Sequence, residues 1–271
     1  MRRRLAALAL FALLSLPAAA EPPGQSARLS FTVYAAGLHV LTIDTEFSLS
    51  PTAYRVDTLF RTAGVAGFLH PGEQLTVSTG RWQGLRAVPE FYQSIGHWSG
   101  DPRRVVIDYG ANPPALRELV LAPDAARTPV PPALLAGSGN LLSAFAEMIR
   151  AYQSTGRCET HLHAFDGRIL TDLSSRSDGV EQIDNPAYRG PALRCDYVGY
   201  PIAGLPADAS AEERAKPVQK GAIWLGRVLP GFPPLPVQMS FLTRWFGEVT
   251  AHLAAAAPEA AMTLTLAQPH S

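Results

Sequence analysis

Two histidines separated by a single residue are the first candidates for chemistry in this sequence. His161 and His163 fall in a stretch where polar and apolar residues alternate, so on a β-strand both imidazoles would point to the same face. Glu159 shares that face, and two imidazoles with a carboxylate can bind zinc or copper. The spacing locates no further ligand, and Leu162 and Ala164 on the other face are typical of an ordinary half-buried strand. We therefore expect no metal and no cofactor, and keep the two histidines as weak metal candidates.

Nucleophilic and acid–base catalysis have weaker support. Ser138 lies between two glycines but lacks the Gly-x-Ser-x-Gly pattern of serine hydrolases, and its position suits a helix cap. Asp166, Asp172 and Asp178 could include a glycosidase-type carboxylate. However, Asp166 followed by Gly167 is a strong signal for a tight hairpin turn. Neither a Walker sequence nor a dinucleotide fingerprint occurs, which argues against a nucleotide cofactor. We expect no catalytic residues and a protein that is not an enzyme.

The composition describes the scaffold that must hold any such site. The 271 residues include 23 Lys+Arg and 23 Asp+Glu, and 47% are hydrophobic. A disordered chain would have fewer apolar residues or a high net charge. A nucleic-acid-binding protein would carry an excess of basic residues. We therefore expect a folded chain that binds no nucleic acid.

The first twenty residues have the pattern of a cleaved export signal. Arg2–Arg4 give a positively charged start, and Leu5–Leu16 is almost entirely apolar. Pro17 ends any helix, and Ala18–Ala20 supplies a small-residue cleavage site, with cleavage after Ala20. The apolar run is too short to be a membrane anchor, which needs about 20 residues. We expect a periplasmic mature chain with no transmembrane segment.

Cys158 and Cys195 are the only cysteines, and both lie in strand-like runs. An even number of cysteines in an exported chain favours a structural disulfide. No Cys-x-x-Cys motif is present to indicate a redox site. The sequence therefore predicts a disulfide between Cys158 and Cys195.

Alternation with a period of two dominates the chain after the signal. Short strand-like runs are separated by Gly, Pro and Asp, which is typical of an antiparallel sheet. The expected strands cover 28–34, 39–49, 54–60, 74–82, 87–98, 104–109, 117–121, 157–165, 168–173, 192–200, 222–228, 237–246 and 248–253. We expect one β-rich domain over residues 21–255 and an exposed loop over 201–217 that could contain a helical turn. We also expect a disordered tail over 256–271, with the alanine-rich stretch from Ala254 marking the start of the loss of order.

One helix is predicted in this β-rich chain. Apolar residues recur at three- and four-residue spacing between Leu141 and Tyr152, and this face should pack on the sheet. Ser138 or Asn140 could cap its start, and Gly156 ends the region. Several aromatic residues in the strand runs could fill a core or line a concave sheet that holds an apolar ligand, and the sequence leaves this open. They are Trp82, Phe91, Tyr92, Trp98, Trp224, Phe241, Trp245 and Phe246.

Short segments in a consistent order give the chain a family resemblance. They are the strand–turn pattern of 31–41, then 62–68 (TAGVAGF), 78–80 (STG), 140–144 (NLLSA), 165–168 (FDGR), Cys195, 201–204 (PIAG), 223–225 (IWL) and 236–237 (PV) leading to 247–249 (GEV). In these the chain resembles the bacterial exported proteins of domain of unknown function family 3108, from about Ser30 to Leu253. One departure is Asn140-Leu141, where members tend to have Asp-Pro at the helix start, and this puts the helix cap in doubt.

The resemblance implies a periplasmic β-rich fold of unassigned activity and supplies no catalytic residues. That fold is similar in style to the periplasmic lipoprotein carriers, whose curved antiparallel sheet is covered by helices and holds acyl chains. We expect a strongly curved antiparallel sheet, a half-barrel or open barrel, with one main helix packed on it. We expect a non-enzymatic protein that binds lipid or another apolar, envelope-derived ligand. The alternatives are a metal- or carboxylate-dependent enzyme around His161, His163 and Asp166, or a scaffold for envelope proteins.

The predicted disulfide can be tested directly by counting free thiols. We expect thiol labelling of the denatured, unreduced protein to detect no free thiol, and labelling after reduction to detect two. Two thiols without reduction would show that the cysteines are not paired. The chain-entropy argument gives the closed loop a stabilising effect of roughly 4 kcal/mol.

Overall fold

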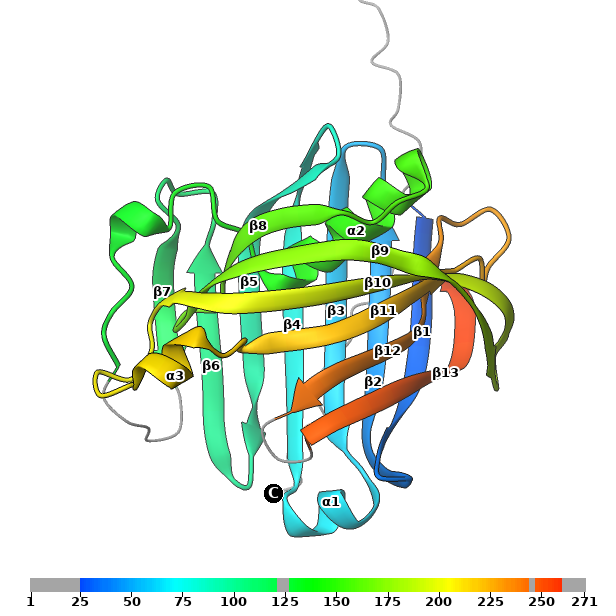
Figure 1. Ribbon diagram of the computed structural model, residues 1–271, viewed down its shortest axis with the longest axis horizontal. Coiled ribbons are helices and arrows are strands. Elements are labelled where there is room, and N and C mark those ends of the chain that lie inside the picture. Colours follow the sequence, from blue (N-terminus) through cyan, green and yellow to red (C-terminus); the bar gives the residue numbers. More distant parts are fainter. Residues whose placement is uncertain (1–24, 121–126, 244–246, 260–271) are drawn as a thin grey trace, which may run out of the picture.

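Thirteen antiparallel strands of the described residues form one continuous sheet that curls around a helix (Figure 1). The structure is a computed structural model that describes residues 25–120, 127–243 and 247–259. The expected export signal, with its cleavage at Ala20, lies outside these residues. The strands are β1 (Gln25–Ala35), β2 (Leu38–Leu49), β3 (Ala53–Thr62), β4 (Gly72–Gln83), β5 (Arg86–Trp98), β6 (Asp101–Asp108), β7 (Ala115–Val120), β8 (Thr160–Phe165), β9 (Leu170–Asn185), β10 (Tyr188–Ala203), β11 (Gln219–Gly226), β12 (Leu235–Thr243) and β13 (Gly247–Glu259).

The strand order explains how a single sheet makes two layers. The order is β7-β6-β5-β4-β3-β2-β1-β13-β12-β11-β10-β9-β8, so β1 joins an N-terminal half to a C-terminal half by pairing with both β2 and β13. Figure 1 shows β8–β13 crossing in front of β1–β7. A twisted sheet of this many strands must curl or fold over, because twist accumulates from strand to strand. The prediction of a mainly β, strongly curved antiparallel sheet with one main helix is confirmed.

The two ends of the sheet are brought together on the far side from β1. The hydroxyl of Tyr109, just after β6, lies 2.8 Å from the carbonyl oxygen of Gly139 and 2.6 Å from that of Phe165 in β8. Gly139 also forms a parallel bridge with Ala164 of β8. A second core cluster fills this junction, with Ile107 and Leu170 both fully buried. The sheet is therefore nearly closed, and side-chain and loop contacts take the place of strand pairing at the gap.

Helix α2 (Leu141–Thr155) lies between the two layers and packs against β3, β4, β5 and β8. The prediction of this helix and of its ends is confirmed. Asn140 caps it, since its side chain accepts the backbone N–H of Ser143 at 2.9 Å, and Gly156 ends it in the left-handed conformation. Asn140 therefore caps the helix even though it stands where members of family 3108 tend to have the Asp of Asp-Pro.

Two buried polar contacts fix α2 against the N-terminal layer. Asn140 donates from its amide nitrogen to the Ser78 hydroxyl of β4 at 3.0 Å. The carboxylate of Glu147, 7% exposed, accepts the backbone N–H of Ala87 in β5 at 2.9 Å. Burial raises the pKa of Glu147, against the opposing effects of this hydrogen bond and of nearby Arg86. The helix is therefore held in register by groups that would be costly to leave unpaired.

The predicted disulfide is present and ties the C-terminal end of α2 to the second layer. Cys158 lies in the coil between α2 and β8, and Cys195 lies in β10, with their Cα atoms 6.1 Å apart. Both residues are fully buried. Because β9 separates β8 from β10 in the sheet, the bridge joins segments that no backbone ladder connects.

Several predicted boundaries are wrong, and the errors share a cause. The strand expected to end at 173 continues to Asn185, and the one expected from 192 begins at Tyr188, because these polar stretches form a long hairpin whose ladder needs no apolar alternation. Pairing with β9 also extends β10 to Ala203, so the first residues of the predicted 201–217 loop belong to a strand. The same loop contains the short helix α3 (Ala211–Ala215).

The disorder expected from residue 256 is wrong as far as Glu259. The alanine-rich stretch pairs with the start of β1, from Ser26 opposite Glu259 to Leu29 opposite Ala256. Residues 260–271 lie outside the described residues. A short helix that was not predicted, α1 (Gly64–Leu69), connects β3 to β4. Within the part of the chain that the structure describes, every helix is too short or too polar to cross a bilayer.

The buried carboxyl of Glu147 predicts a pH-dependent stability. Because its pKa is raised in the folded state, Glu147 favours folding while it is protonated and loses that contribution as the pH rises through the folded-state pKa. Glu147→Gln keeps an acceptor for the Ala87 N–H and stays neutral. We therefore expect the variant to gain stability relative to the wild type as the pH rises from about 4 to about 8. Glu147→Ala leaves the N–H unpaired and should lose about 1–3 kcal/mol.

The measurement is the free energy of unfolding from urea titrations at a series of pH values. A Glu147→Gln variant whose stability ran parallel to that of the wild type across this range would contradict the assignment. The Glu147→Ala variant then reports separately whether the Ala87 contact matters.

Candidate ligand-binding site

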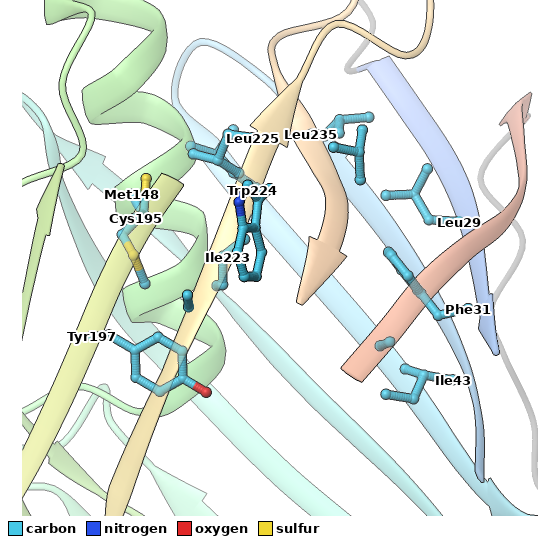
Figure 2. Close-up of a cluster of buried hydrophobic side chains, with 14 of the residues drawn as sticks. Leu29, Phe31, Ile43, Met148, Cys195, Tyr197, Ile223, Trp224, Leu225 and Leu235 are labelled. Atoms are coloured by element: carbon cyan, nitrogen blue, oxygen red, sulfur yellow. The ribbon is translucent and has the colours of Figure 1, made fainter. Parts of the chain in front are cut away.

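An apolar cavity of about 300 Å³ lies between the two layers of the sheet. The N-terminal layer contributes Phe31, Ile43 and Phe47 to its wall, and the C-terminal layer contributes Tyr197 and Ile223. Figure 2 shows side chains of both layers meeting in one buried cluster. The cavity exists because two concave surfaces face each other and one helix fills only part of the space between them.

Helix α2 forms the roof of the cavity with its first turns only. Leu141, Leu142 and Phe145 line the cavity, whereas the later residues Met148 and Ile149 pack into the core beyond it. Phe145 also makes an edge-to-face contact with Tyr197 of β10, with ring centroids 5.7 Å apart. The helix therefore fills one end of the space between the layers and leaves the other end open.

A strip of small polar groups crosses the wall that β2, β3 and β4 provide. The Thr45 and Thr58 hydroxyl oxygens lie 3.3 Å apart. Gln74 donates to the Ser94 hydroxyl at 2.8 Å, and the Thr76 hydroxyl lies 2.9 Å from the same oxygen. These groups satisfy one another, so the wall offers hydroxyls and an amide without a charge. Thr45 alternates in the sequence with the apolar Ile43 and Phe47, which puts the three on one face of β2. No pattern in the sequence indicates that threonines of neighbouring strands lie side by side.

Ionisable side chains are sparse around the cavity. Among the described lining residues they are Lys220, which is exposed at the rim, and the phenols of Tyr92 and Tyr197. Burial is the main cause that raises the pKa of both phenols above the ordinary range. Both tyrosines are therefore neutral at physiological pH. The described lining contains no carboxylate and no histidine, so it holds no pair of groups suited to acid–base catalysis.

Polar contacts hold the C-terminal end of α2 against the N-terminal layer. The Arg150 guanidinium lies over the Trp82 ring, 4.5 Å from its centroid, and donates to the Gly84 carbonyl at 2.9 Å. The Trp82 indole N–H lies within hydrogen-bonding distance of the carbonyl oxygens of Ser50 and Ala53. This end carries a separate, more polar hollow, lined by Arg150 and Gln153 among others.

The two candidate metal ligands lie on the solvent-facing side of β8, as the simpler interpretation of their alternation indicated. His161 and His163 are exposed, whereas Leu162 and Ala164 between and beyond them are buried. His161 Nε2 lies 2.6 Å from a carboxylate oxygen of Asp172 in β9, and His163 Nε2 lies 4.0 Å from it.

The third candidate ligand, Glu159, is engaged by other groups. Glu159 precedes β8 and bonds to Arg157, whose guanidinium is the main cause that lowers the pKa of this carboxyl to about 2. In the described ranges, 25–120, 127–243 and 247–259, no three His, Cys, Asp or Glu side chains gather as a metal site would require.

The remaining catalytic candidates have local structural roles. Asp166 accepts the backbone N–H groups of Arg168 and Ile169 at 2.8 and 2.7 Å, so it stabilises the β8–β9 turn. This turn is a hairpin connection as predicted, although four residues separate the paired Phe165 and Leu170. Ser138 is buried before the start of α2, but Asn140, not Ser138, supplies the cap.

Some of the aromatic residues predicted in strands line the cavity, and others lie in the core, at the surface or at the C-terminal end of α2. Tyr92 and Phe241 line the cavity. Trp98 packs against the main core, and its indole N–H donates to Gln74 at 2.9 Å. Trp224 is buried, with its N–H bonded to Glu181 at 2.8 Å, and Phe91 is 37% exposed. Trp82 lies under Arg150 at the far end of α2, and Trp245 and Phe246 lie outside the described residues.

Comparison with known proteins supports the architecture. The chain is similar to the crystal structure of a β-barrel-like protein of domain of unknown function family DUF1849 from Brucella abortus. The TM-score is 0.55 with 10% sequence identity, over 87% of this chain and 98% of the other. At this identity the likeness shows the fold alone. No family model and no curated protein matches the sequence.

Proposed function

We propose that this protein is a non-enzymatic, periplasmic binder of an apolar or envelope-derived ligand, held in the cavity between the two sheet layers. The observation that carries the proposal is the lining: aliphatic and aromatic side chains, a strip of neutral hydroxyls and an amide, and no carboxylate or imidazole among the described residues around it. Such a lining stabilises hydrocarbon by removing it from water, at about 25 cal/mol per Å². It places no acid, base or nucleophile beside a bound ligand.

The size and lining of the cavity favour a ligand with at least one acyl chain. About 300 Å³ lies at the lower end of the range of pockets that bind small molecules. The uncharged strip around Thr45 and Thr58 suits an ester, amide or hydroxyl near the chain, since such groups can exchange hydrogen bonds with hydroxyls. The exposed amine of Lys220 marks where a headgroup would meet solvent.

The location and family membership are part of the same proposal. The basic and apolar start of the sequence supports export, and the disulfide suits an oxidising compartment. We propose membership of domain of unknown function family 3108 on the ordered segments that run from about Ser30 to Leu253. The curved sheet around a helix is also similar in style to the periplasmic lipoprotein carriers.

Filling the cavity should abolish ligand binding without unfolding the protein. Met239 of β12 lines the cavity and is half-buried, so Met239→Trp places an indole in the ligand volume. Gln238 is the preceding residue on the same strand, is also half-buried and does not line the cavity, so Gln238→Trp is the matched control. We expect Met239→Trp to weaken binding of a dansyl-labelled fatty acid at least about tenfold, and Gln238→Trp to change it less than about twofold.

The titration is followed by dansyl fluorescence, with native mass spectrometry of the gently purified protein as an independent measurement of retained lipid. Circular dichroism and thermal unfolding establish that both variants fold. The proposal is wrong if the wild type neither retains lipid nor binds the probe, or if both tryptophan variants bind the probe as the wild type does.

A further inference from the structure

The connection between β3 and β4 presents large apolar side chains to solvent. Val65, Phe68 and Leu69 of α1 are 64%, 86% and 61% exposed, and Leu38 at the β1–β2 turn is 62% exposed. Figure 1 shows α1 beyond the ends of β3 and β4, at the end of the molecule that carries the β1–β2 turn, and α1 packs against β2. We call these four residues the α1 tip.

The segment that carries the α1 tip is held firmly to the rest of the fold. Ala66, 6% exposed, belongs to the main core cluster, so α1 buries its smallest side chain and turns its largest ones outward. The Ala63 N–H donates to the Val40 carbonyl at 2.9 Å, and the Gly72 N–H donates to the Thr62 hydroxyl at 2.8 Å. An ordinary amphipathic helix turns its large apolar side chains toward the core and its polar ones toward solvent. The opposite arrangement in α1 marks the α1 tip as an interaction surface.

The connection contains few ionisable side chains. No Asp, Glu, Lys or Arg occurs between Arg61 and Glu73, and the ionisable residue there is His70, whose Nδ1 lies 3.4 Å from the Ser99 hydroxyl. Arg61 itself is paired, since its guanidinium lies 2.6 Å from Glu73 and 3.2 Å from Asp44. A partner of the α1 tip is therefore met mainly through apolar contact, because the four residues of the tip are all apolar and the connection carries no Asp, Glu, Lys or Arg.

We propose that the α1 tip inserts into the hydrocarbon boundary of a lipid bilayer. A protruding apolar helix of six residues enters a soft apolar phase without needing a complementary surface. The exposed area of four such side chains is on the order of a few hundred Å². A stable protein–protein interface needs about 800 Å² from each partner, so the α1 tip is too small for one by itself.

The cavity extends toward the end of the molecule that carries the α1 tip. Phe60 and Gln74 line the cavity from the ends of β3 and β4 that α1 connects. Because α2 fills the opposite end, the end that the α1 tip would place on the bilayer is the one left unfilled. Transfer of an acyl ligand between bilayer and cavity follows from this arrangement, and that step rests on the proposed function, whereas the docking does not.

Vesicle sedimentation tests the docking. We expect the purified protein to bind phosphatidylcholine vesicles and the double variant V65S/F68S to lose at least about tenfold in partition coefficient. The matched control is L116S/V180S, because Leu116 and Val180 are 40% and 64% exposed on β7 and β9. Binding should change little between about 0.05 and 0.5 M NaCl, since an apolar contact is not screened by salt. The conservative variant Phe68→Trp should keep wild-type binding.

Each other result has a defined meaning. The docking is refuted if the wild type does not sediment with the vesicles, or if V65S/F68S sediments as the wild type does. It is also refuted if the wild type is a dimer by light scattering and V65S/F68S is a monomer, because the α1 tip would then be covered by a second copy of the chain. Binding of the dansyl-labelled fatty acid is measured on the same samples. If the wild type binds vesicles but not the fatty-acid probe, the proposed function is refuted and the docking stands. If the wild type binds the probe but not vesicles, the docking is refuted and the proposed function stands.

Discussion

The architecture depends on one constraint: a sheet of thirteen strands that curves over itself must fill the space it encloses. Apolar residues on the inner faces of β1, β2, β10 and β11 fill only part of that space, and α2 occupies a further part of it. The helix is held there by directional contacts, since Glu147 and Asn140 meet Ala87 and Ser78 across a buried boundary. Apolar burial alone is non-directional and would let the helix shift along the sheet. These two contacts fix its position, and therefore fix which part of the interior stays empty.

The chemistry of the empty part follows from the alternation of the strands. Each strand sends one set of side chains inward and one outward, and among the described residues that line the cavity the charged one is Lys220, at the rim. The ion pairs Arg61–Glu73 and Arg194–Asp196, for example, both lie on the strands' outer side, away from the cavity. What remains inside is aliphatic, aromatic or neutral and hydrogen-bonded. An interior built in this way offers a bound group mainly apolar contacts and neutral hydrogen-bonding partners.

The elements that could be predicted from the sequence are those that local chemistry determines. The α2 periodicity and the Cys158–Cys195 pairing depend on residue types at short spacing or on the only two cysteines available. The sequence left the helix cap open between Ser138 and Asn140, and the structure has Asn140. The extensions of β9 beyond residue 173 and of β10 beyond 192–200 were not predicted, and neither was the end of β13. A backbone ladder with another strand holds these stretches, and their sequences lack a clear apolar alternation. The cavity could not be predicted for a related reason. Thr45, Thr58 and Thr76 come together through register between strands, and single-strand patterns contain no register.

The molecule is therefore different at its two ends, and this difference bears on how a ligand would enter. At one end the C-terminal half of α2 is tied to both layers, by Arg150 over Trp82 on one side and through the Cys158–Cys195 bridge on the other. Opening that end would break a disulfide, a cation–π contact and several backbone hydrogen bonds together. At the other end, the cavity is bordered by Phe60 and Gln74 and by the exposed rim residues Lys220 and Leu242. Movement of exposed rim side chains occurs on far shorter timescales than the unpacking of a helix. A ligand exchanging with the cavity would thus pass through the end that carries the α1 tip, which is the end where an apolar surface is already presented to the surroundings.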